Sequence, residues 1–365
     1  MRVDTIPTPA LVVDVPTLRR NLSAMAAFFA EGACRVRPHF KAHKTPAIAR
    51  LQLDAGSTSG LTCATVDEAE VVADFCDDVL VANEVVTADK CERLAGLAGR
   101  VRLTVAADSL AGLQALSLAA VRRAVTIGVL VDVNVGQDRC GVSPGPEALA
   151  LARQAASTPG LELRGVMGYE GHLQPIADRL ERAAKATAAM ETLVGVAAAV
   201  RAEGLPCEVV SGGGTGTYDI SGRVPGVTEI QAGSYALMDS DYARLGLPFE
   251  QAVFVLGTVV SRPTPSRLVA DCGHKSCSKD HGLPIAVGLT GAEVRGLNDE
   301  HVTLAVPPET PVAIGERIRL QPSHLDPTIN LHDVLYAVEA DGSVAVWPVT
   351  ARGYADERAS LQKNR

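Results

Sequence analysis

Between residues 36 and 235, short β-rich runs alternate with alanine- and leucine-rich stretches, and this alternation constrains the fold more than any other feature. Two of the runs, at 78–82 and 126–133, are continuously apolar, which is typical of parallel strands covered on both faces. The predicted strands are residues 36–41, 60–64, 78–82, 101–106, 126–133, 163–169, 207–211 and 228–232.

The segments between these runs have helical patterns. Thr65 is followed three positions later by Glu68, which is a capping-box pattern at the start of a helix. Residues 144–157 and 179–203 are rich in alanine and charged on one side. Strands alternating with helices in this number predict an α/β fold, a (β/α)8 TIM-type barrel. A doubly wound sheet is the alternative that the pattern leaves open.

The sequence changes character after about residue 245, where proline becomes frequent and long helical runs end. The predicted strands there are residues 252–260, 267–270, 302–305, 317–321, 334–338 and 344–349. They indicate a C-terminal, mostly β domain. The apolar run at 10–15 precedes the barrel and is expected to pair with that domain. We therefore predict a barrel at 12–240 and a β domain made of 1–11 and 241–365.

Charge and composition exclude several classes of partner. The net charge is −8 and no block of Lys and Arg is present, which argues against a nucleic-acid partner. The first residues contain no apolar signal core, and the longest apolar runs have strand length, so we expect no secretion and no membrane partner. The 8 cysteines contain no C-x-x-C pair and are expected to be free thiols. These features predict a cytoplasmic protein.

Lys41 lies in the most informative segment of the N-terminal half, Arg37-Pro-His-Phe-Lys-Ala-His-Lys44. It falls at the C-terminal end of the first predicted barrel strand, which is the end that carries the chemistry in such barrels. An amine that is desolvated there beside Arg37 and Lys44 would be nucleophilic enough to form an imine. A solvated, positively charged loop is the alternative, because lysines are usually surface residues.

Glycine-rich segments follow the last two predicted barrel strands, at 210–217 and 230–235. Glycine lets backbone N–H groups approach a phosphate closely, and barrels of this type often bind phosphate at these two loops. The predicted phosphate ligands are Gly213, Gly214, Thr215, Gly233 and Ser234.

Together with the S-G-G-G-T-G and G-S-Y-x-x-M-D loops, the lysine segment resembles the motifs of fold-type III pyridoxal-phosphate (PLP) enzymes, the alanine racemase-like barrels. It is most similar to the branch that contains D-threonine aldolase, D-3-hydroxyaspartate aldolase and eukaryotic-type D-serine dehydratase. The resemblance implies that Lys41 holds PLP as a Schiff base. It also implies that Arg139, in an R-x-G-V context, lies near the phenolic oxygen of PLP and that Tyr169 contacts its ring.

His324 and Asp326 are the candidate metal ligands. On an extended segment, residues two apart project to the same side, and this pair would leave coordination positions open for water or substrate oxygen. A bare H-x-D is also common in surface loops. The wider H-x-D-P-T-x-N-x-H-D stretch and W-P-V-x-A-R-G at 347–353 are similar to the C-terminus of the aldolases. An aspartate ligand favours Mn²⁺ or Mg²⁺, with Zn²⁺ possible, whereas the dehydratases resemble this segment with cysteine there.

The resemblance implies an aldolase for D-3-hydroxy-amino acids of the D-threonine type. The metal would bind the β-hydroxyl, a base would remove its proton, and cleavage of the Cα–Cβ bond would give glycine and an aldehyde. His172, just after the sixth predicted barrel strand, is the candidate base. A homodimer is also implied, because barrel and β domain of opposite subunits meet at the active site in this fold type.

Several alternatives stay open at this point. D-3-hydroxyaspartate is another substrate for the same cleavage. Dehydration by the same metal would give a keto acid and ammonia. Racemisation is a third reaction and needs no metal. A non-enzymatic PLP-binding module belongs to a different class, and small carriers of that kind lack the C-terminal β domain that this chain is predicted to have.

Overall fold

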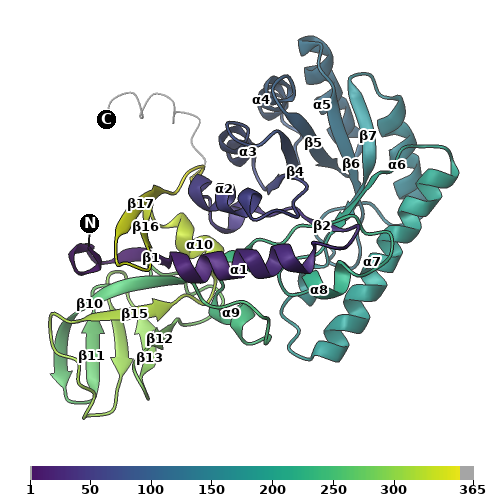
Figure 1. The fold of residues 1–365 in the computed structure, drawn as a ribbon. Helices are drawn as coiled ribbons and strands as arrows, with labels where there is room; N and C mark the ends of the chain where they lie inside the picture. The colour runs from purple at the N-terminus through teal and green to yellow at the C-terminus, as the bar shows by residue number, and fades with distance from the viewer. Residues whose placement is uncertain (1, 354–365) are drawn as a thin grey trace.

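Parallel strands form one of two sheets in the computed structural model, which describes residues 2–353 (Figure 1). The 8 strands follow the order β2-β9-β8-β7-β6-β5-β4-β3. β-Bridges from Val36 to Thr58 and from His39 to Thr62 join the two ends of that order. The closed sheet confirms the (β/α)8 barrel and excludes the open doubly wound alternative. The bounds are β2 Arg35–Val36, β3 Leu61–Cys63, β4 Asp78–Glu84, β5 Arg102–Ala107, β6 Ile127–Asp132, β7 Leu161–Gly168, β8 Val209–Gly212 and β9 Glu229–Ile230.

The helices that connect these strands cover the outside of the barrel (Figure 1). Thr65 caps the third of them, because its hydroxyl accepts the Glu68 N–H. The Glu68 carboxylate does not complete a capping box and accepts instead from Ala64 N and Lys44. The bounds are α1 Val15–Phe28, α2 Pro46–Asp54, α3 Val66–Val72, α4 Ala88–Ala98, α5 Leu110–Arg123, α6 Pro146–Ser157, α7 Arg179–Ala202 and α8 Tyr218–Ser221.

Among residues 2–353, α7 alone is long and apolar enough to cross a membrane when judged by length and composition. It contacts β7 and β8 of the barrel. Met190, Leu193 and Val196 lie buried on that side, within the main hydrophobic core. The barrel therefore accounts for the apolar composition of α7.

The second sheet contains 9 strands in the order β13-β14-β11-β10-β1-β16-β17, with β15 paired to β10 and β12 paired to β15. All the strands predicted after residue 245 are confirmed. The structure adds two more, β12 Ile285–Val287, which has three residues, and β13 Glu293–Leu297, which is interrupted by a bulge between Val294 and Gly296. The other bounds are β1 Ala10–Asp14, β10 Val253–Thr264, β11 Arg267–Ala270, β14 Val302–Ala305, β15 Arg317–Gln321, β16 Val334–Val338 and β17 Val344–Pro348.

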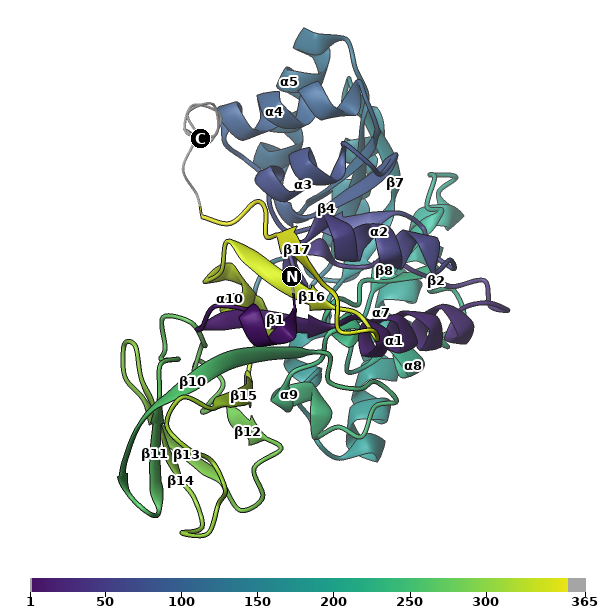
Figure 2. The same cartoon turned by 60° about the vertical axis from the view of Figure 1, so that its left-hand side comes forward.

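β1 connects the two sheets. It pairs antiparallel with β10 and parallel with β16, as expected for the apolar run near the N-terminus. The domain boundary predicted at residue 12 falls inside this strand. Asp14 ends β1 and caps α1, since its carboxylate accepts the Thr17 N–H at 2.8 Å. Figure 2 shows the chain passing from the β domain into the barrel along β1 and α1.

Candidate active site

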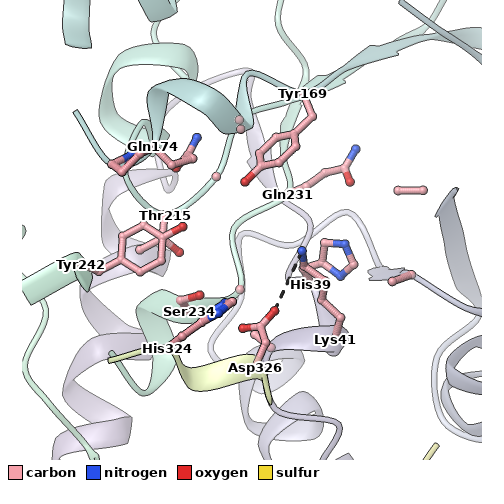
Figure 3. Close-up of a pocket in the computed structure, with 18 of the residues that line it drawn as sticks. His39, Lys41, Tyr169, Gln174, Thr215, Gln231, Ser234, Tyr242, His324 and Asp326 are labelled. Carbon is pink, nitrogen blue, oxygen red and sulfur yellow. Dashed lines mark ion pairs between the residues drawn. The ribbon is translucent and has the colours of Figure 1, made fainter. Parts of the chain in front are cut away.

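A cavity of about 470 Å³ lies where the C-terminal ends of the barrel strands face the β domain (Figure 3). Its volume is in the range of small-molecule and cofactor sites. The lining comes from the loops after several barrel strands and from the region around helix α10, Leu325–Asn330. All the predicted site residues line it except His172. Residues predicted from segments nearly 300 positions apart therefore meet in one place.

Lys41 stands at the mouth of the barrel, although not on a strand. β2 ends at Val36, and Lys41 lies in the 3-10 turn η2, Phe40–Ala42. Its Nζ atom is 3.9 Å from Asp326 Oδ2, and its side chain is 42% exposed. The fold thus brings the predicted Schiff-base lysine against a predicted metal ligand of the β domain.

The prediction that Lys41 is desolvated among other cations is wrong. Arg37 is buried lower in the barrel, where it pairs with Glu229 at 2.9 Å and with Asp78 at 2.8 Å. Lys44 pairs with the buried Glu68. These carboxylates neutralise both cations, because a buried charge without a partner is costly. The charged neighbour of Lys41 is a carboxylate instead.

The two glycine loops contribute to the lining of the cavity. Gly213 has a φ of 71°, which glycine adopts without strain. A Cβ atom added at Gly214 would lie 2.8 Å from the Gln174 side chain, and one added at Gly233 would lie 2.8 Å from the Cβ of Ala42. Close approach of these backbones to their neighbours therefore requires glycine.

Glu170 is fully buried behind the first glycine loop. Its carboxylate accepts the Gly213 N–H at 3.1 Å and the hydroxyls of Thr217 and Ser221, each at 2.7 Å. The Gly214 N–H also has an acceptor within the protein, the Thr217 hydroxyl at 3.2 Å. The amides of Gly213 and Gly214 thus hold the loop in shape in this structure. That both residues bind phosphate stays a prediction. Like these two residues, Thr215, Gly233 and Ser234 line the cavity.

Arg139 and Tyr169 lie together on another wall. The Arg139 guanidinium carbon is 5.7 Å from the centre of the Tyr169 ring, within cation–π range. Burial, followed by the Glu170 and Asp326 carboxylates, raises the pKa of Tyr169, so the phenol is neutral. Tyr169 directly follows β7, whereas the sequence predicted it to be the last residue of the sixth barrel strand.

His172 lies outside the cavity in this structure. The 3-10 turn η3, Gly171–Leu173, reverses the chain just after Tyr169. The turn buries Leu173 and Gln174 and exposes the His172 ring. The structure therefore does not bring the predicted base together with the other site residues.

His324 and Asp326 both line the cavity, although not on an extended segment as predicted. His324 precedes α10, and Asp326 lies in its first turn. Pro327 suits that turn because it has no N–H to satisfy, and an acidic side chain there is favoured by the helix dipole. The helix starts here because the buried Asp239 carboxylate accepts the Leu325 N–H at 3.0 Å.

Asp280 and His281 are cavity-region residues that sequence reasoning missed. Asp280 Oδ2 is 2.7 Å from His324 Nδ1, and the His281 ring stacks on the His324 ring at 4.0 Å. His281 Nδ1 is 2.6 Å from Asp241 Oδ2. These residues lie in an irregular loop that has no periodic relation to His324, so the sequence offers no signal for them.

Comparison with known proteins places both parts of the chain in described families. The family "Alanine racemase, N-terminal domain" matches residues 13–241. The family "Putative serine dehydratase domain" matches residues 252–338.

Similarity to individual proteins extends over nearly the whole chain. A D-threonine aldolase of Arthrobacter sp. is 41% identical, over 97% of this chain and 94% of the relative. A 3-hydroxy-D-aspartate aldolase of Paracoccus denitrificans is 36% identical, over 95% and 92%. The crystal structure of D-threonine aldolase from Filomicrobium marinum superposes with a TM-score of 0.92 at 40% identity, covering 97% of each chain.

Proposed function

The chain belongs to the alanine racemase-like family of PLP enzymes, and on that premise we propose that it is a PLP- and divalent-metal-dependent aldolase. Its proposed substrates are D-3-hydroxy-amino acids of the D-threonine type, which it cleaves to glycine and an aldehyde. The observation that carries this proposal is the 3.9 Å approach of Lys41 to Asp326 in a cavity that His324 also lines. An imine-forming amine and a metal-binding pair there can reach one small substrate.

The residues present fit PLP. The cavity offers an amine at Lys41 and the tightly packed backbones of two glycine loops. His39 lines it as well, and its Nδ1 is buried without a hydrogen-bond partner among the described residues. Burial, followed by the charge of Lys41, lowers the pKa of His39 well below its ordinary value. A neutral ring with an unsatisfied nitrogen is suited to a polar group of a bound cofactor.

The residues present also fit a divalent metal ion. An imidazole and a carboxylate, from His324 and Asp326, are ordinary ligands for such ions. A carboxylate oxygen is a hard ligand, which favours Mn²⁺ or Mg²⁺ over Zn²⁺. A bound ion supplies Lewis acidity to a substrate hydroxyl.

When bound, PLP supplies an aldehyde for an amine and an electron sink for breaking a carbon–carbon bond. Lys41 Nζ is the amine that holds the cofactor and returns to it after turnover. Asp326 and His324 orient the β-hydroxyl of the substrate, and Tyr169 and Arg139 form the opposite wall. The loops after the barrel strands and the region around α10 bound the space in which the reacting carbon would lie.

His172 remains our proposed base for the hydroxyl proton, and acting as base requires η3 to turn its ring inward. His281 is a second candidate, because it already lines the cavity and its Nδ1 is held by Asp241. Replacing each by alanine separates the two. Removing the base is expected to lower kcat about 10²–10⁴-fold. If kcat falls in H281A and not in H172A, His281 is the base instead.

The product formed from D-threonine tests the proposal. Acetaldehyde and glycine are expected from the wild-type protein, with L-threonine as the control substrate that should stay unchanged. EDTA should stop the cleavage and leave the PLP absorbance in place, whereas Lys41→Ala should remove that absorbance. Activity that is insensitive to EDTA would contradict metal dependence and favour racemisation.

Dehydration is the second candidate, and the match of residues 252–338 to the serine dehydratase domain favours it. It predicts 2-oxobutanoate and ammonia from D-threonine. Asp326 favours the aldolase, because the dehydratases resemble this segment with a cysteine at that position. A carboxylate oxygen suits a harder metal ion than a thiolate does. Finding the keto acid as the main product would replace the first proposal with this one. Comparing D-threonine with D-3-hydroxyaspartate then defines the preferred side chain.

A further inference from the structure

The loop between β11 and β12 brings an acidic residue against the candidate metal ligand His324. Asp280 Oδ2 lies 2.7 Å from His324 Nδ1. The other carboxylate oxygen accepts the Ser278 hydroxyl at 2.7 Å. Ser278 is itself tied to α10, because its N–H donates to the Thr328 hydroxyl at 3.1 Å. The Asp280 carboxylate is thus held in one orientation relative to His324.

The flat face of the His324 ring is also held. The His281 ring stacks on it at 4.0 Å, with 13° between the planes. His281 is fixed in turn by Asp241, at 2.6 Å from Nδ1. His324 therefore has one edge against Asp280 and one face against His281, which leaves little rotational freedom for its ring.

The contact with Asp280 decides which nitrogen of His324 can bind a metal ion. An ionised carboxylate has no hydrogen to donate, so Nδ1 of His324 must carry the proton in this pair. Nε2 then has the free lone pair. Metal-binding histidines commonly donate their other N–H to a carboxylate, which fixes both tautomer and ring orientation.

We infer that Asp280 is a positioning residue that holds His324 in its Nδ1–H tautomer and directs Nε2 toward a divalent metal ion beside Asp326. This inference rests on the proposed metal dependence and adds to it a residue that does not contact the metal. A direct role for Asp280 is the competing arrangement. Asp280, His281 and His324 each offer a ligand atom, and these atoms lie within 4.8 Å of one another.

Binding of Mn²⁺ to the PLP-loaded protein tests the inference, measured by the EPR signal of free Mn²⁺. Asp280→Ala is expected to weaken Mn²⁺ binding about 10–100-fold, with the PLP absorbance and the urea unfolding midpoint unchanged. Asp280→Asn should restore most of the affinity, because its amide oxygen still accepts the Nδ1–H. A metal-ligating Asp280 would not be rescued in this way, since the amide lacks the charge.

The chain provides a matched control. Asp299 makes the same kind of contact with His274, at 2.7 Å from Nε2, on an exposed surface outside the cavity. Asp299→Ala is expected to bind Mn²⁺ like the wild type. His281→Ala, which removes a stacking partner but no proposed ligand, should weaken binding less than Asp280→Ala.

The outcomes separate this inference from the proposed function. Wild-type affinity in Asp280→Ala overturns the inference alone. Equal losses in Asp280→Ala, Asp280→Asn and His281→Ala also overturn it, in favour of direct ligation by all three residues. A wild-type protein that binds no Mn²⁺ and cleaves D-threonine without metal overturns the proposed metal dependence, and the inference with it.

Discussion

At the scale of single residues, Glu170 shows how a buried charge shapes a binding loop. Three donors, from Gly213, Thr217 and Ser221, converge on its carboxylate. Such a cluster tolerates burial because hydrogen bonds from fixed donors replace those from water. It also means that the glycine loop has its shape before any ligand enters, which lowers the entropy cost of binding.

We predict that Glu170→Ala weakens PLP binding, because three buried donors lose their acceptor and the loop loses its support. The free energy of unfolding should fall by about 1–3 kcal/mol for each donor left unpaired. Loss of PLP absorbance on dialysis measures the cofactor effect. Ser221→Ala removes one donor and is the milder control. Glu170→Ala that keeps PLP as tightly as the wild type would contradict the prediction.

Asp132 is a buried residue at the C-terminal end of β6 whose charge state affects stability. Burial, followed by the facing Glu84 carboxylate, raises the pKa of Asp132 from its ordinary value of 3.8 to about 8. The two carboxyl groups titrate as a pair. The folded protein therefore keeps a proton that the unfolded chain releases between these two pH values.

We predict that this group stabilises the protein most at low pH and that the contribution is lost as the pH rises through about 8. Asp132→Asn mimics the neutral form, so the fall in the free energy of unfolding between about pH 5 and pH 8 should become smaller. Urea unfolding across that range measures it. The exposed Asp138, on the following loop, gives the control Asp138→Asn. If the free energy of unfolding of Asp132→Asn falls with pH as steeply as that of the wild type, the shared proton is contradicted.

At the scale of elements, one carboxylate joins the barrel to the helix that carries the candidate metal ligands. Asp239 accepts the Tyr242 N–H at the start of α9, Ser240–Ala243, and the Leu325 N–H at the start of α10, each at 3.0 Å. Helix N-termini leave N–H groups without partners, and a capping side chain satisfies them. This side chain thus holds the start of α10 to the start of α9.

We predict that Asp239→Ala destabilises the protein by about 0.5–2 kcal/mol for each cap that is lost. It should also weaken Mn²⁺ binding, because α10 carries Asp326, and should leave the PLP absorbance in place. Asp239→Asn should restore much of both, since asparagine caps helices as well as aspartate does. Urea unfolding and Mn²⁺ titration provide the readouts. An Asp239→Ala protein with wild-type Mn²⁺ affinity would show that α10 is positioned by other contacts.

At the scale of the whole molecule, one hydrophobic cluster spans both sheets, beside a second cluster that lies mostly around β3, β4 and β5. The first cluster contains Leu11 and Val13 of β1, Leu320 of β15, and Met190 and Val131 of the barrel. β1 lies inside the second sheet, between β10 and β16, and continues directly into α1. No linker therefore separates the β domain from the barrel at this point of the chain. Shared burial of this kind couples the stability of the two parts.

We predict a single unfolding transition in urea. Trp347, the one tryptophan of the sequence, lies in β17 and reports on the β sheet. Far-UV circular dichroism is dominated by the helices around the barrel. The two signals should change at the same urea concentration, because the shared core is lost as one unit. Separate midpoints would show that the barrel and the β sheet unfold independently.

The sequence by itself determined the barrel, the β domain and most of the site. Eight β-rich runs alternating with helical stretches predicted the barrel, because strand and helix patterns are local in the chain, although they left a doubly wound sheet open. Lys41, Tyr169, His324 and Asp326 were identified from their motifs, and each lines the cavity. The strands β12 and β13 were missed, since β12 has only three residues and a bulge interrupts the alternation in β13.

The tertiary structure alone decided how those residues face one another. Asp280 reaches His324, and Lys41 reaches Asp326, across stretches of chain with no common periodicity. The direction of His172 was likewise set by a 3-10 turn that leaves no clear mark in the sequence. Contacts of this kind arise from the packing of loops on a closed barrel. Their geometry follows from which strands become neighbours, and no local pattern of residues encodes it.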